Sequence, residues 1–242
     1  MRIGLLTCCW ADDDPPRGRL AEIVLRHNGA IRVPGVELVR VAVYSREDKH
    51  ISPALAVPGW TYQQFPNRPL SDKWDAGAKL LRTKNVDAMM IFGSDDFLNA
   101  EYIEAAADAL RKGAKYAMPK SLYFFDAKEK KAMYCPVIGR VGGGRALSRN
   151  LLDRMHWEPW ERGYQRNIDG CMDRRLIDIG HKHPDATIDD IRSLSALILG
   201  IKTGGNLHSF DKMRRGLQGE PVDSGALLER YVPEYSEELL NW

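Results

Sequence analysis

Cysteine is scarce in this 242-residue chain, and the few cysteines present form no recognised motif. They lack Cys-x-x-Cys spacing, and the adjacent pair would point to opposite faces of a strand. The four residues are Cys8, Cys9, Cys135 and Cys171. This usage fits a reducing compartment, so we expect a cytoplasmic protein.

Long hydrophobic runs are also missing. The longest one after the N-terminus, residues 194–201, is far too short to cross a membrane. The first ten residues are apolar for too short a stretch to be a signal peptide, and Asp12, Asp13 and Asp14 follow closely. The sequence therefore predicts a soluble protein without a membrane span.

Charge of one sign does not dominate. Lys and Arg number 35 and Asp and Glu number 33, so the net charge is +2. This balance does not indicate a nucleic-acid-binding protein, although clustering of charge matters more than its sum. Internal repeats, heptad arrays and low-complexity segments are absent from the sequence. Its length fits one α/β domain over residues 1–218, with a helical C-terminal tail over 219–242 packed on the same domain.

Hydrophobic periodicity and turn residues predict alternating strands and helices. We expect strands over residues 3–9, 37–44, 60–65, 86–92 and 115–118, and helices over 17–26, 70–83 and 100–112. Residues 122–125 and 132–135 are expected to be hairpin arms around a charged tip. Residues 188–199 fit a helix or a strand. The order of elements predicts a mixed, mostly parallel central sheet flanked by helices.

Residues 88–96, Ala-Met-Met-Ile-Phe-Gly-Ser-Asp-Asp, are the most informative stretch. The apolar run is typical of a strand buried on both faces. Asp95 and Asp96 follow where this strand would leave the core, which is where open α/β sheets bind ligands. Their oxygen atoms suit a magnesium or manganese ion that bridges phosphates. Alternatively, one of the two caps the helix expected after Asn99.

Two further segments accompany this stretch: Pro-Leu-x-x-Lys-Trp-x-x-Gly at residues 69–77 and Gly-Gly-Gly-Arg at 142–145. Over roughly residues 1–210, the three together resemble GT-A-fold glycosyltransferases of the family 2 type, whose metal-binding Asp-x-Asp motif follows a buried strand. The resemblance implies a GT-A (Rossmann-like) fold, a nucleotide-diphosphate sugar as donor substrate and Mn²⁺ or Mg²⁺ as cofactor. Gly93 departs from the pattern, because it stands where the first aspartate of the motif would be.

The resemblance also implies roles for individual residues. It makes Asp95 a metal ligand, Asp96 its neighbour in the metal site, and His208 a third ligand from the end of the fold. Donor-binding residues are implied after the first strand, in the helix at 70–83, beside the metal motif and in the glycine turn: Thr7, Trp10, Lys73, Ser94, Asp95, Gly143, Gly144 and Arg145. Asp12 to Asp14 are further candidates, or they favour the start of the next helix. Asp75 stands where many family members have Asn.

The glycine turn at residues 142–144 fits neither of two well-known nucleotide motifs. Leu147 occupies the place of the third glycine of a dinucleotide fingerprint, and Arg145 stands where a P-loop requires Lys. Glycines permit close approach of the backbone to a ligand, and in the resembled family this segment lies against the donor sugar. A plain flexible turn is an equally good interpretation of the glycines alone.

A second cluster begins with His-Trp-Glu-Pro-Trp at residues 156–160 and continues through the acidic segment 167–176. It resembles the tryptophan-rich acceptor loop and acidic helix start of galactosyltransferase-type and family 2 enzymes, where a carboxylate is the catalytic base. The flat faces of Trp157 and Trp160 suit sugars or stacked bases. Asp169 best matches the base, and Asp173 lies one turn further on. The plainer interpretations are a helix N-cap for Asp169 and a surface neighbour of Arg174 for Asp173.

These features favour a metal-dependent hexosyl- or pentosyltransferase that inverts the anomeric centre. The alternatives are a sugar-nucleotide nucleotidyltransferase, which would need a glycine-rich phosphate loop after the first strand, and a non-catalytic nucleotide-binding module. Lys212 and its basic neighbours are expected to meet the diphosphate or an anionic acceptor. The acceptor stays open, with a hydroxymethylated base in DNA, as for some phage enzymes, as one candidate. That candidate depends on basic residues near the proposed site, namely Arg145, Arg149, Arg174, Arg175, Arg214 and Arg215.

Overall fold

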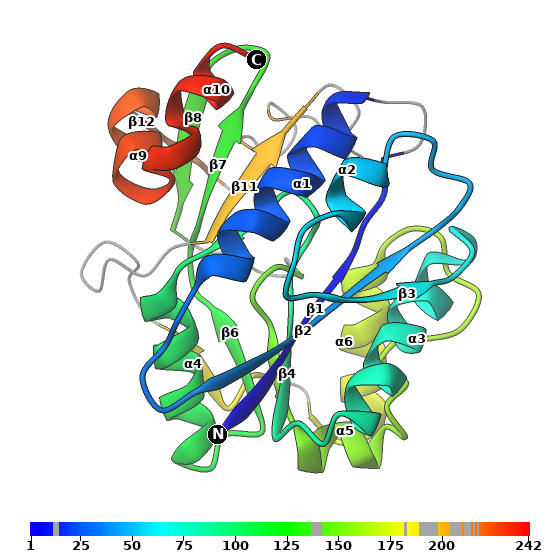
Figure 1. Ribbon diagram of the computed structural model, residues 1–242. Helices are drawn as coiled ribbons and strands as arrows, with labels where there is room; N and C mark the ends of the chain where they lie inside the picture. Colours follow the sequence, from blue (N-terminus) through cyan, green and yellow to red (C-terminus); the bar gives the residue numbers. More distant parts are fainter. Residues whose placement is uncertain are drawn as a thin grey trace.

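The computed structural model of the chain describes residues 1–11, 15–136, 142–181, 183–188, 198–203, 210, 214, 216 and 218–242. In these ranges the chain forms two sheets with helices around them (Figure 1). The larger sheet has the order β10-β6-β9-β4-β1-β2-β3. Its strands are β10 (Ala186–Ile188), β6 (Tyr116–Pro119), β9 (Ala146–Ser148), β4 (Ala88–Ile91), β1 (Arg2–Cys8), β2 (Glu37–Tyr44) and β3 (Thr61–Gln64).

The smaller sheet has the order β12-β8-β7-β11-β5. Its strands are β12 (Glu220–Val222), β8 (Lys131–Cys135), β7 (Leu122–Asp126), β11 (Ile198–Lys202) and β5 (Asp96–Leu98). The helices are α1 (Pro15–Ala30), α2 (Ser52–Leu55), α3 (Leu70–Thr83), α4 (Ala100–Arg111), α5 (Arg149–Arg154), α6 (Ile168–Asp178), α9 (Ser224–Tyr231), the short η1 (Pro233–Tyr235) and α10 (Ser236–Leu240).

The larger sheet is parallel except at β9, which runs antiparallel to both of its neighbours, β4 and β6. The predicted mixed, mostly parallel sheet flanked by helices is therefore confirmed. The predicted bounds of β2 and α3 agree with the structure, and the predicted hairpin is formed by β7 and β8. Sequence reasoning missed four short strands, β5, β9, β10 and β12, because three residues are too few to show a period.

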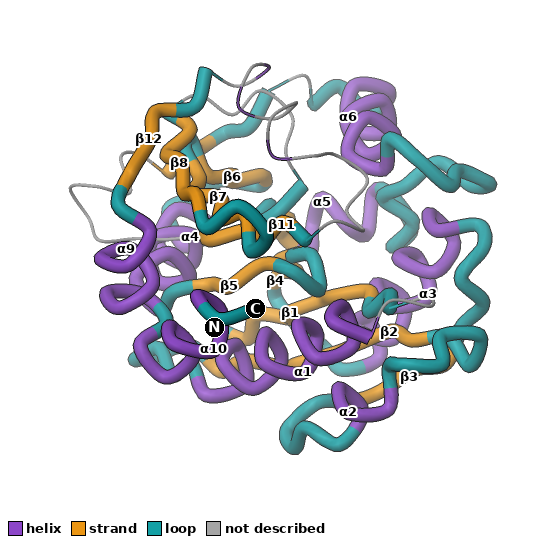
Figure 2. The backbone as a smooth tube through the Cα atoms, turned by 90° about the horizontal axis from the view of Figure 1, so that it is seen from above, coloured by secondary structure: helices purple, strands orange, loops and turns teal. Residues whose placement is uncertain are grey.

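Alternation along β1 divides the core into two layers. Ile3 and Leu5 belong to the layer that packs under α1 and α4, whereas Leu6 and Cys8 belong to the layer under α3, α5 and α6. Successive side chains of a strand point to opposite faces, so both faces of this central strand are buried. Figure 2 shows β1 and β4 lying between α1 on one side and α5 on the other.

The helix after the central strand begins with its own cap. The Asn99 side chain accepts a hydrogen bond from the Glu101 N–H at the start of α4. Asp96 belongs to strand β5, where it pairs with Gly200 of β11. The alternative interpretation of Asp95 or Asp96 as the cap of this helix is therefore wrong, and both carboxylates need another explanation.

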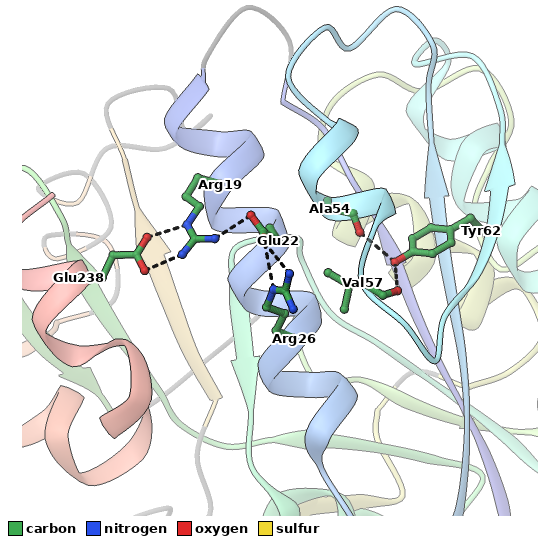
Figure 3. Close-up of polar contacts among 7 residues, drawn as sticks. All are labelled: Arg19, Glu22, Arg26, Ala54, Val57, Tyr62 and Glu238. Atoms are coloured by element: carbon green, nitrogen blue, oxygen red, sulfur yellow. Dashed lines mark hydrogen bonds and ion pairs between the residues drawn. The ribbon is translucent and has the colours of Figure 1, made fainter.

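The C-terminal segment packs on the main core. Leu227, Leu228 and Leu239 are buried in the same hydrophobic cluster as α1 and α4. Arg19 of α1 donates to both carboxylate oxygens of Glu238 in α10, at 2.7 and 2.8 Å, and also to Glu22 (Figure 3). Apolar burial and a forked ion pair thus hold the tail against the first helix.

All four cysteines are buried free thiols, and the adjacent Cys8 and Cys9 lie in opposite core layers, as their positions on a strand predict. Within the described ranges, no helix has the length and hydropathy needed to cross a membrane.

Candidate active site

The turn after β4 is closed by its own aspartate. Asp96 Oδ2 accepts the Gly93 N–H at 2.7 Å, and the Asp96 N–H donates to the Gly93 carbonyl at 3.1 Å. A β-carbon at position 93 would lie 2.5 Å from Asp95 Oδ1 and 2.9 Å from Asp96 Oδ2. Close packing against two carboxylates therefore favours glycine here, and the aspartate that the family pattern expects at this position would have to displace them.

Asp95 forms an ion pair with Lys202, the last residue of β11. The Lys202 Nζ lies 3.2 Å from Asp95 Oδ2, and the two side chains are only 14% and 15% exposed. Burial raises the pKa of Asp95, but the positive charges of Lys202 and Arg17 outweigh it, so the pKa ends below its ordinary value. Asp95 is therefore ionised at neutral pH.

Asp96 titrates differently from its neighbour. Burial and the negative charge of Asp95 raise the pKa of Asp96 to about 7, against an ordinary value of 3.8, and Asp169 adds to the rise. Lys202 and the Gly93 N–H act in the opposite direction. Two adjacent carboxylates cannot both ionise easily, so this site carries one fixed negative charge and one carboxyl that gains a proton near neutrality.

The glycine turn lies close to two carboxylates that come from distant parts of the chain. A β-carbon at Gly143 would lie 2.9 Å from Asp96 Oδ2, and one at Gly142 would lie 2.0 Å from Asp169 Oδ1. Gly144 has φ +81°, and its N–H donates to the Ile91 carbonyl at 2.7 Å. The turn is therefore fixed to the end of β4. Nearby carboxylates favour glycine at positions 142 and 143, and the left-handed backbone favours it at 144.

Asp169 lies in the first turn of α6, and Asp173 follows one turn later. The N-cap residue is Asn167, in a left-handed conformation with φ 55°, so the N-cap interpretation of Asp169 is wrong. Asp173 Oδ1 accepts a hydrogen bond from Arg145 Nη1 at 2.7 Å, so it is not merely a surface neighbour of Arg174. Asp169 is half-buried beside the glycine turn.

Arg145 is buried beneath this cluster. Its side chain is 1% exposed, and its Nη1 lies 2.7 Å from Asp173 Oδ1 and 3.5 Å from the Asp169 carbonyl oxygen. Burial lowers the pKa of Arg145, but Tyr116, Asp169 and Asp173 together raise it by more. The pKa therefore ends above its ordinary value, and the guanidinium stays charged. The predicted donor-binding arginine thus serves mainly to hold the first two turns of α6 against the glycine turn.

Of the other predicted donor-binding residues, Thr7 and Lys73 are fully buried. The Lys73 ammonium donates to the Cys9 carbonyl at 2.6 Å and to Asn67 Oδ1 at 2.7 Å. It fixes the loop after β1 to α3, and its predicted contact with the donor stays a prediction.

Trp10 and Ser94 lie at the edges of the loops that border the carboxylates. The Arg17 guanidinium carbon lies 4.5 Å from the centre of the Trp10 ring, a cation–π contact, and Ser94 is 7% exposed. Asp12 to Asp14, His208, Lys212 and Arg215 lie outside the described residues, so their predicted roles stay predictions.

The tryptophans of the expected acceptor loop do not present a stacking surface. Trp157 and Trp160 are 0% and 1% exposed and belong to the core layer under α3, α5 and α6. The Trp160 ring packs against Trp74 at 5.3 Å, and Trp157 Nε1 donates to Asp153. The expectation that their faces bind a sugar or a base is wrong, because both rings are enclosed by the core.

The basic residues of the DNA hypothesis do not form one exposed patch among the described residues. Arg145 is buried with Asp173, and Arg174 is paired with Glu161. Arg149 contacts Asp153 at 3.7 Å, on α5.

Two residues at this edge escaped sequence reasoning, Lys202 and Arg17. Lys202 is the last residue of an apolar strand. A charged residue at the end of such a strand was the signal that could have identified it, as for Asp95. For Arg17 the sequence offered no signal beyond its position just after Pro15-Pro16, at the start of a predicted helix. Neither pattern indicates a partner by itself.

The described residues do not fit the divalent ion that the resemblance implies. Gly93 provides no carboxylate, and Asp95 already forms an ion pair with the Lys202 ammonium. Among the described residues no group of three His, Cys, Asp or Glu side chains gathers in a metal-binding arrangement. Hard cations need several converging oxygen atoms, whereas the described residues at this edge offer Asp95, which is paired with a lysine, and Asp96.

Solved structures share this fold. No family profile and no curated protein sequence matches the chain. The structure superimposes on TarS 1–349 of S. aureus in complex with UDP-GlcNAc with a TM-score of 0.59 and 10% identity, over 99% of this chain and 70% of that one. The same fragment in complex with UDP gives a TM-score of 0.56 and 9% identity over the same shares. The chain thus has the fold of TarS, a GT-A glycosyltransferase of the family 2 type.

Proposed function

We propose that this chain is a glycosyltransferase that moves a sugar from a nucleoside-diphosphate sugar to an acceptor hydroxyl, with Asp169 as general base. One observation supports this most: Asp96 at the start of β5 and Asp169 in the first turn of α6 both approach the same glycine turn. The surrounding fold is shared with a protein whose structure contains UDP-GlcNAc. Open α/β sheets bind ligands at this edge.

In the proposed reaction, the Asp169 carboxylate accepts the proton of the acceptor hydroxyl. The hydroxyl oxygen bonds to the anomeric carbon while the bond from that carbon to the diphosphate oxygen breaks. The nucleoside diphosphate leaves with the electron pair, and this single displacement inverts the anomeric centre. Asp173 has a positioning role, because its ion pair with Arg145 holds in place the turn of α6 that carries Asp169.

The donor is proposed to lie along the loop at Trp10, beside Ser94 and Asp95, and over the backbone of Gly143 and Gly144. These small or polar groups border the carboxylates, and glycine lets the backbone approach a sugar closely. We further propose that residues 1–218 form the catalytic domain and that residues 219–242 are a tail. The buried thiols of all four cysteines fit a reducing, cytoplasmic setting.

A screen of nucleotide sugars tests the proposal. We expect slow hydrolysis of one class of donor without an acceptor, followed by transfer when sugars, glycopeptides, lipids and hydroxymethylated DNA are offered with that donor. Asp169→Asn should remove transfer and keep donor binding. A wild-type protein that binds and hydrolyses none of the nucleotide sugars would refute the proposal.

A further inference from the structure

We propose that Lys202 supplies the positive charge that holds and neutralises the diphosphate in this chain, in place of a divalent ion. The inference rests on the proposed function, because it assigns a residue to the leaving-group side of that same site. The observation behind it is the ion pair between Lys202 and Asp95, residues that lie 107 positions apart in the sequence.

The backbone fixes Lys202 at the carboxyl edge before any ligand arrives. Strand β11 pairs with β7 on one side and with β5 on the other. The Ile201 N–H donates to the Asp95 carbonyl at 2.8 Å, and the Ala127 N–H donates to the Lys202 carbonyl at 2.9 Å. The lysine side chain therefore starts from a rigid position beside the end of β4, which reduces the entropy lost when it binds an anion.

The side chain of Lys202 is confined but open to the site. It is 14% exposed, and its ammonium lies 5.2 Å from the centre of the Phe124 ring. The apolar ring and the partial burial lower the local dielectric, so the attraction between an ammonium and a phosphate oxygen is stronger than in water. The ammonium carries three N–H donors, and Asp95 Oδ2 accepts one, which leaves capacity for a phosphate oxygen.

A second cation lies beside the loop where the nucleotide is proposed to bind. Arg17 is near the N-terminus of the 16-residue helix α1, and its guanidinium packs on Trp10 in the loop after β1.

The charges at this edge favour a diphosphate without a metal ion. A pair of aspartates in an Asp-x-Asp motif is anionic and repels a diphosphate unless a divalent cation lies between them. Here Gly93 provides no carboxylate, and a side chain at this position would crowd Asp95 and Asp96. The Lys202 ammonium offsets the charge of Asp95 and keeps N–H donors for the incoming anion. As the bond to the sugar breaks, the same ammonium stabilises the charge that grows on the departing diphosphate.

Binding of nucleoside diphosphates with and without metal tests this role. UDP, GDP, ADP and CDP would be titrated into the wild-type protein by calorimetry, once in EDTA and once in Mn²⁺. We expect the best ligand to bind with affinities that agree within about threefold in the two buffers, because the cation is built into the chain. Lys202→Met should weaken binding in EDTA at least tenfold, which is about 1.4 kcal/mol.

Two further variants serve as controls. Lys131→Met removes the same charge from an exposed position on β8, where the lysine is 67% exposed, and should leave binding unchanged. Lys202→Arg keeps the cation and should retain most of the affinity. Melting curves of each variant separate a loss of binding from a loss of folding.

Each outcome decides the inference. Wild-type binding that requires Mn²⁺ overturns it, and so does a folded Lys202→Met protein that binds in EDTA as well as the wild type. If Lys202→Met does not fold, the wild-type comparison of EDTA with Mn²⁺ decides by itself. A wild-type protein that binds no nucleoside diphosphate in either buffer refutes the proposed function, and the role of Lys202 with it.

Discussion

Replacing Asp75 by Asn should make the protein more stable at neutral and alkaline pH. Asp75 is on α3 and 4% exposed. Its Oδ1 accepts the Trp160 N–H at 3.3 Å, while its buried Oδ2 has no hydrogen-bond partner among the described residues. Burial raises the pKa of this carboxyl to about 8. An amide has nearly the same shape, never ionises, and is what many members of the resembled family carry here.

The sign of the pH dependence of stability follows from how many protons the folded and unfolded states bind. The unfolded chain releases the Asp75 proton near its ordinary pKa of 3.8, and the folded chain retains it up to about pH 8. Between these values the folded state binds the extra proton, so the free energy of unfolding falls as pH rises, by at most about 1.4 kcal/mol per pH unit. Over about four units the upper limit is about 6 kcal/mol. Half of that amount would shift Tm by about 5 to 10 °C in a protein of this size.

Urea unfolding of both proteins from pH 4.5 to 8.5 measures the effect. The difference in unfolding free energy, Asp75→Asn minus wild type, should be small at pH 4.5 and grow steadily to pH 8. Subtracting the two curves removes the contribution of other groups that titrate in this range, including Asp96. Asp72→Asn, one turn earlier on α3, removes the same charge from a more exposed carboxyl and should give no such slope. Parallel curves for Asp75→Asn and wild type would refute the argument from burial.

Three further outcomes are expected. Asp169→Asn should lower the transfer rate by about a hundredfold or more with little change in donor binding, because a general base acts in the transition state; an inactive Asp173→Asn beside an active Asp169→Asn would move the base by one helical turn. Arg145→Met should lower the free energy of unfolding by about 3 kcal/mol, because it leaves Asp173 without its buried partner, and Arg145→Lys should recover part of the loss in urea unfolding. If DNA is the acceptor, affinity for short duplexes should fall steeply between two salt concentrations and should drop in a variant with Arg174→Ala and Arg175→Ala, whereas no binding at low salt would exclude that acceptor.

Sequence reasoning succeeded where the relevant interactions are local. The apolar run before Asp95 predicts a strand buried on both faces, and β4 lies inside the larger sheet with β1 and β9 beside it. The spacing of Leu70, Gly77 and Leu81 predicts α3 with its bounds, because a helical face repeats every three to four residues. Asp169 was expected at a helix start, and it lies in the first turn of α6.

Burial, by contrast, was decided by tertiary packing. A segment with tryptophans near acidic residues looks the same in sequence whether the rings face a ligand or the core. Trp160 is enclosed because α3 brings Trp74 and Asp75 against it. Lys73 is likewise recognisable as a notable lysine, but only the fold turns its ammonium toward the Cys9 carbonyl.

The partners of the charged residues were also beyond the sequence by itself. The chain specifies that Asp95 follows a buried strand and that Lys202 ends another, since each lies at the end of an apolar run. It does not specify that the two strands meet, because 107 residues separate them and their distance depends on how both sheets are assembled. The same holds for Gly93 and Gly142. Both glycines are visible in the sequence, but only the tertiary structure brings close the carboxylates that would crowd a side chain there.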